Sequence, residues 1–167
     1  MAAQEGAVFI GKYAASFIFK GEGRLTQKSL GSMNAAVKQC ADDDGVTELL
    51  IDITGCRYMD STILGIIARW AIVFAKTHSA PPFLLGLPGN PLESIFDRMN
   101  LTTLFHVSRE TQFTSKEALT QVTVAEHVTG PEYAEYLLSA HEALADLSEE
   151  NAQEFAAVIQ CLRAELH

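Results

Sequence analysis

The fold of this 167-residue chain is decided by one stretch, which reads Leu49-Leu-Ile-Asp-Ile-Thr-Gly-Cys-Arg-Tyr-Met-Asp-Ser-Thr-Ile-Leu-Gly65. The segment 48–54, which overlaps its beginning, is β-branched and almost continuously apolar, which is typical of a strand buried on both faces of a sheet. After a short turn, Asp60-Ser61-Thr62 opens an apolar run that reaches about Thr77 with the spacing of a helix. A buried strand that turns into an apolar helix predicts an α/β fold.

The flanking sequence supplies further strands and helices. Apolar segments at residues 7–13 and 16–20 flank Ala14-Ala15 and predict a β-hairpin. A loop over residues 21–25 follows, and Thr26 is expected to cap a helix that reaches about Cys40. Further along we expect a strand, a helix, a strand and a helix at residues 83–87, from Pro91 to Met99, 104–107 and 115–122. This order predicts a mixed sheet of four to five strands flanked by helices.

The last third of the chain differs in charge. Residues 114–167 hold 2 of the 12 Lys and Arg residues but 10 of the 21 Asp and Glu residues. Pro131 suits the first turn of a helix that should end near Leu147, and Ser148 with two following glutamates predicts a second helix start. We therefore divide the chain into a domain at 1–122 and an acidic C-terminal αα-hairpin extension at 123–167.

Composition excludes several classes of function. The net charge of −9 argues against binding to nucleic acid and to an anionic membrane surface, because both need basic side chains. The N-terminus lacks the features of a secretory signal, and the longest apolar stretch, residues 63–75, is too short to span a bilayer and contains Arg69. Cys40, Cys56 and Cys161 have no disulfide or metal-ligand spacing. We expect a cytoplasmic protein with reduced thiols, no metal and no cofactor.

The strand, the turn and the Asp60-Ser61-Thr62 helix start resemble the signature of STAS domains, the family of anti-sigma-factor antagonists and sulphate-transporter tails. The element order from residue 7 to about 121 matches as well, as do the Gly23-Arg24-Leu25 segment and residues 100–107. One departure is Ile63, because many family members have glycine there; Gly65 follows two residues later. The resemblance implies a STAS-like fold of 1–122 with a mixed sheet.

The resemblance also implies a function. In regulatory members, the serine that matches Ser61 is phosphorylated by a partner kinase that is itself the anti-sigma factor, and a metal-dependent phosphatase reverses the reaction. A serine at a helix start should be solvent-accessible, and a phosphate would add about −1.5 to −2 charges beside Asp60. Thr62 is an alternative acceptor, and the partner-binding surface would comprise Asp60, Ser61, Thr62, Gly23 and Arg24. The simpler alternative is that Asp60 or Ser61 only caps the helix.

The helix after Ser61 is apolar around most of its circumference. One face, which should pack on the sheet, comprises Leu64, Ile67, Ala68, Ala71, Phe74 and Ala75. A second stripe of Ile66, Trp70 and Val73 lies roughly opposite and forms a candidate interface. The C-terminal hairpin, a second copy in a homodimer, or the partner kinase would have to cover this stripe.

We do not expect an enzyme. Ser61 lacks the Gly-x-Ser-x-Gly elbow of hydrolases, and Gly21-x-Gly23-x-x-Thr26 lacks the third glycine of a dinucleotide loop. The sequence therefore predicts a phospho-switchable anti-sigma-factor antagonist that binds its kinase when unphosphorylated. Two alternatives stay open: a STAS module that binds a nucleotide or lipid or serves a transport system, and an oligomerising scaffold.

Overall fold

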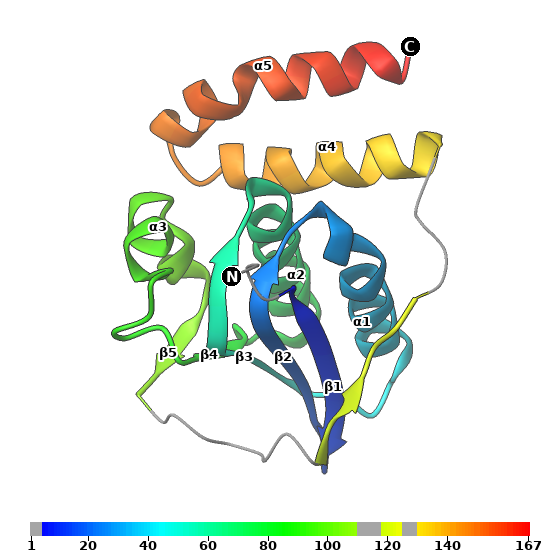
Figure 1. The fold of residues 1–167 in the computed structure, drawn as a ribbon, viewed down its shortest axis with the longest axis vertical. Helices are drawn as coiled ribbons and strands as arrows, with labels where there is room; N and C mark the ends of the chain where they lie inside the picture. Colours follow the sequence, from blue (N-terminus) through cyan, green and yellow to red (C-terminus); the bar gives the residue numbers. More distant parts are fainter. Residues whose placement is uncertain (1–4, 110–117, 125–129) are drawn as a thin grey trace.

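The computed structural model describes residues 5–109, 118–124 and 130–167, and its centre is a six-stranded mixed sheet (Figure 1). The strand order is β5-β4-β3-β2-β1-β6, with β1 antiparallel to both of its neighbours and the other pairs parallel. The strands are β1 (Ala7–Tyr13), β2 (Ser16–Leu25), β3 (Glu48–Met59), β4 (Phe83–Leu85), β5 (His106–Ser108) and β6 (Thr120–Gln121). The predicted α/β class with a mixed sheet is confirmed.

Helices pack on one face of the sheet and across one of its ends (Figure 1). They are η1 (Gln27–Ser29), α1 (Leu30–Asp42), α2 (Ser61–His78), α3 (Glu93–Arg98), η2 (Leu101–Leu104), α4 (Pro131–Ala145) and α5 (Glu149–Glu165). Thr26 caps the short η1 turn that leads into α1, and Ser148 caps α5 by accepting from the Asn151 amide. The Ser148 cap and the predicted C-terminal αα-hairpin are confirmed, whereas α1 itself begins at Leu30, after the turn that Thr26 caps.

The sheet is larger than the sequence predicted. β2 continues through Leu25 and β3 through Met59, where a loop and a turn were expected, because the two segments pair with each other across β-bulges. Thr120–Gln121 forms strand β6 beside β1 instead of the end of a helix, and the rest of that predicted helix lies mainly outside the described residues. The sheet therefore has six strands, where four to five were expected.

Trp70 packs on the sheet, so its predicted position opposite the sheet is wrong. Its ring meets the edges of Phe17 and Phe19 of β2, with ring centroids 6.3 and 5.5 Å away, and only 5% of the residue is exposed. Ile66 is also buried, whereas Val73 is 51% exposed. The three residues share the side of α2 that faces α1 and α4, so the C-terminal hairpin is the neighbour that partly covers this stripe.

The C-terminal hairpin lies across the end of the sheet where β3 ends and α2 begins, with α4 against α2 and α5 outside α4 (Figure 1). Its side chains Ala140, Leu144 and Phe155 belong to the same buried core as α2. Asn151 is 1% exposed, and its side-chain amide donates to the carbonyl oxygens of Met99 and Leu144, both at 2.9 Å. These contacts hold the hairpin on the sheet domain.

Among the helices that the structure describes, none combines the length and the hydropathy needed to cross a bilayer.

Candidate functional site

Asp60 builds the start of α2. One carboxylate oxygen accepts from the Ile63 amide at 3.0 Å, which caps the helix, and the other accepts from the Gln27 amide at 2.9 Å. The Asp60 amide donates to the Leu25 carbonyl at 3.2 Å. Asp60 therefore joins the end of β2, the η1 turn and the first turn of α2, and so orients Ser61 at the first helical position.

The Ser61 hydroxyl lies under α4 instead of pointing freely into solvent, contrary to expectation. Its Oγ is 3.3 Å from Nε2 of His141, and Ser61 as a whole is half-buried. His141 is 5% exposed, and its Nδ1 lies 2.8 Å from the Leu137 carbonyl oxygen. Because a carbonyl only accepts, Nδ1 carries a hydrogen, and in this tautomer Nε2 accepts from the Ser61 hydroxyl. The predicted acceptor is thus hydrogen-bonded to the C-terminal hairpin.

Gly65 lets α4 approach α2 closely, one helical turn after Ser61. A Cβ atom added at Gly65 would lie 2.3 Å from the Ala140 carbonyl oxygen and 2.6 Å from its carbon, which is far inside van der Waals contact. Thr62, the alternative acceptor, is 2% exposed, so a kinase cannot reach its hydroxyl in this conformation. Ser61 is therefore the more accessible hydroxyl of the pair, and α4 restricts access to it.

Gly23 and Arg24 lie beside this site, but within β2 rather than in a loop. Gly23 has φ +70° at a β-bulge, and Arg24 pairs with Tyr58 of β3. The exposed Arg24 guanidinium stacks over the Tyr58 ring at 4.0 Å from its centroid, close to the Asp60 cap. Arg24 and Tyr58 thus place an exposed cation and an exposed aromatic ring on the surface beside the start of α2.

His141 was not among the residues predicted for the site. A signal was present, because His141 falls on the apolar stripe of the predicted helix together with Ala134, Leu137 and Leu144. A histidine on a buried stripe needs hydrogen-bond partners. The sequence could not identify Ser61 as that partner, since 80 residues separate the two.

A cavity of about 470 Å³ lies between α1, α2 and α4. Its walls are mainly apolar and include Val37, Ile66, Trp70, Val73, Phe74 and Ala140. Cys40 also lines it, and burial raises the pKa of this thiol to about 11, as it does for Cys56. Both thiols are therefore protonated at neutral pH and poor nucleophiles.

The Ser61–His141 pair and the cavity are separate features of the molecule. A serine hydroxyl bonded to a histidine is found in hydrolases, but neither Ser61 nor His141 lines the cavity above. Within the described ranges, no three His, Cys, Asp or Glu side chains come together as a metal site requires.

Comparison with protein-family models gives no match, and comparison with curated proteins gives none either.

Proposed function

We propose that this protein is a phospho-switchable binding protein of the anti-sigma-antagonist type, with Ser61 as the phosphorylated residue. The observation that carries the proposal is the position of Ser61: it opens α2 after the Asp60 cap, and its hydroxyl bonds to His141 of α4. The partners would be a serine kinase acting as anti-sigma factor and a metal-dependent phosphatase. The resemblance of Asp60-Ser61-Thr62 to the STAS signature supports this choice of partners.

Docking of the hairpin and phosphorylation of Ser61 would oppose each other. A phosphorylated Oγ has no hydrogen to donate to His141, so the hydrogen bond from Ser61 to α4 would be lost. If the side chain turns away, Nε2 of His141 remains buried without its partner, which costs about 1–3 kcal/mol. Phosphorylation would therefore weaken the attachment of α4 to α2 and change the surface offered to the kinase.

A chain that carries phosphoserine at position 61 tests this function without requiring an identified kinase. Such a chain can be made by genetic-code expansion and compared with the unmodified protein by hydrogen exchange. We expect faster exchange in α4 and α5 and unchanged exchange in β2 and β3. Identical exchange in the hairpin would refute the switch. A kinase encoded by a neighbouring gene should phosphorylate the wild type but not Ser61→Ala, and phosphate on Ser61→Ala would refute the assignment of the site.

His141→Ala is expected to speed phosphorylation of Ser61. The substitution removes the acceptor of the Ser61 hydroxyl and the ring that packs against Phe155, so the hairpin should open more often. A loss of about 1.4 kcal/mol in docking free energy would raise the phosphorylation rate roughly tenfold where opening limits it. His167→Ala is the matched control, because His167 is exposed at the end of the chain. Equal rates for the two variants would contradict the role of His141.

A further inference from the structure

The cavity between α1, α2 and α4 is distinct from the Ser61 site and has the character of a ligand pocket. Its volume of about 470 Å³ lies within the range of small-molecule sites, and most of its wall is apolar. Trp70 and Phe74 of α2 form part of this wall, and Tyr136 and Ala140 close it from α4. The pocket is therefore complete only when the hairpin is docked.

Two polar groups at the α4 side of this cavity lack partners among the described residues. The Tyr136 hydroxyl is buried and makes no hydrogen bond, which is uncommon for a polar atom in a protein interior. The exposed Arg69 makes no ion pair or hydrogen bond within the described part of the chain. Arg69 and Tyr136 are close enough to interact electrostatically, since the positive charge of Arg69 opposes the rise in the Tyr136 pKa to about 12 that burial causes.

The opposite end of the cavity is acidic. Asp43 and Asp44 line it near the C-terminal end of α2, where His78 bonds to the Val46 carbonyl at 3.0 Å. His78 lies about 13 Å along the helix axis from Arg69. Lys12 neutralises Asp43 by an ion pair at 2.8 Å, whereas Asp44 has no such partner among the described residues. An anionic group would therefore be favoured at the Arg69 end and disfavoured at the other.

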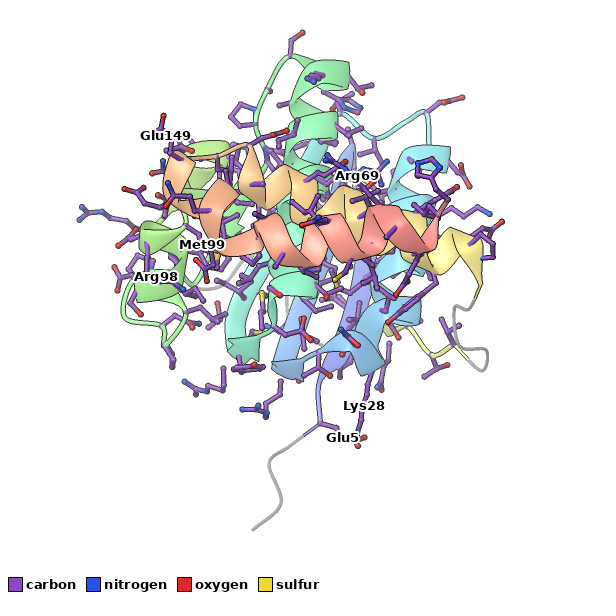
Figure 2. The ribbon with its side chains drawn as sticks, turned by 90° about the horizontal axis from the view of Figure 1, so that it is seen from above. Glu5, Lys28, Arg69, Arg98, Met99 and Glu149 are labelled. Atoms are coloured by element: carbon purple, nitrogen blue, oxygen red, sulfur yellow. The ribbon has the colours of Figure 1, made fainter. Side chains whose placement is uncertain are left out.

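We propose that this cavity binds a small amphiphilic carboxylic acid. Its carboxylate would pair with the Arg69 guanidinium and accept a hydrogen bond from Tyr136 after a small movement of that ring, and its apolar body would lie against Trp70 and Phe74. Seen from above in Figure 2, Arg69 and Lys28 lie on opposite sides of the hairpin, so the Arg69 end of the cavity is separated from the η1 turn by the hairpin. Because α4 forms one wall, binding favours the docked hairpin.

Decanoate and 1-decanol are suitable probes, because they share an apolar chain and differ in charge. Trp70 is the only tryptophan of the chain, so its fluorescence reports directly on the cavity, and isothermal titration calorimetry gives an independent affinity. We expect saturable binding of decanoate, weaker binding of 1-decanol, and slower hydrogen exchange in α4 when decanoate is bound. Absence of saturable binding by both methods would overturn the proposal, as would equal affinity for the alcohol.

Two substitutions locate the carboxylate. Arg69→Gln is expected to weaken decanoate binding roughly tenfold, and Tyr136→Phe about fivefold, while the affinity for 1-decanol stays the same. Arg57→Gln and Tyr13→Phe make the same chemical changes at exposed positions outside the cavity and should have no effect. If Arg69→Gln and Tyr136→Phe bind decanoate with the same affinity as Arg57→Gln and Tyr13→Phe, the carboxylate does not lie at the Arg69 end of the cavity, and the proposal is wrong. Decanoate binding is measured on the unphosphorylated wild-type chain, so its outcome does not depend on whether Ser61 is a phosphorylation site.

Discussion

Gly65→Ala is expected to loosen the C-terminal hairpin while leaving the sheet domain folded. The new Cβ would lie 2.3 Å from the Ala140 carbonyl oxygen, so α4 must move away from α2 or remain strained. Such overpacking destabilises the docked hairpin by about 3 kcal/mol, and the better helix propensity of alanine offsets about 1 kcal/mol of this loss. The net loss of about 2 kcal/mol should raise hydrogen-exchange rates in α4 and α5 roughly 30-fold.

The same substitution also tests the link between docking and phosphorylation. If the docked hairpin shields Ser61, Gly65→Ala should be phosphorylated faster than the wild type, although neither Ser61 nor His141 is altered. Gly45→Ala is the matched control, because the added Cβ there would meet only the flexible tips of Lys12 and Asp43 at 3.0 and 3.2 Å. Exchange rates in α4 that match those of Gly45→Ala would show that Gly65 does not govern docking.

Local signals predicted the elements around the site well. The apolar run of β3, the capping position of Asp60 and the apolar spacing of α2 act within a few residues of one another, and the structure places all three as expected. The Ser148 cap and Pro131 likewise marked the two helices of the hairpin. Short-range hydrogen bonds and helix periodicity are encoded locally, so a single sequence suffices to read them.

Contacts between residues far apart in the sequence could not be predicted from such local signals. The segment that begins at Gly21 looked like a loop because of its glycines, yet it extends β2 because Gly55–Met59 of β3 lies beside it. The Ser61–His141 contact depends on where the hairpin docks, which neither segment specifies alone. Partners far apart in the chain are chosen by packing of the whole molecule, so the sequence predicted Ser61 as the site but not its burial.

The helix α2 shows why a hydrophobic pattern can mislead. Its residues are apolar almost all round, because the sheet covers one side and α4 approaches another, at Gly65. A helix wheel then identifies the apolar arc but not which part of it faces the sheet. The pattern placed Trp70 opposite the sheet, whereas the tryptophan meets Phe17 and Phe19 of β2.

Trp70→Ala should therefore destabilise the whole domain and not only the hairpin. The substitution removes a large side chain that is 5% exposed, together with its edge-to-face contacts with Phe17 and Phe19. We expect a loss of about 4 kcal/mol in the free energy of unfolding, measured by urea denaturation. Hydrogen exchange should become faster in β2 and β3 as well as in α4, whereas Gly65→Ala affects the hairpin alone.

Val73→Ala provides the control for Trp70→Ala, because Val73 lies on the same helix and also lines the cavity but is 51% exposed. Val73→Ala should lower the free energy of unfolding by less than about 1 kcal/mol and leave hydrogen exchange in β2 unchanged. The comparison separates the two possible positions of Trp70. A tryptophan held only by the hairpin would give faster exchange in α4 and α5 with little change in β2, and that result would contradict the packing of Trp70 on the sheet. Faster exchange throughout β2 and β3 follows only if its ring is part of the core that joins α2 to the strands.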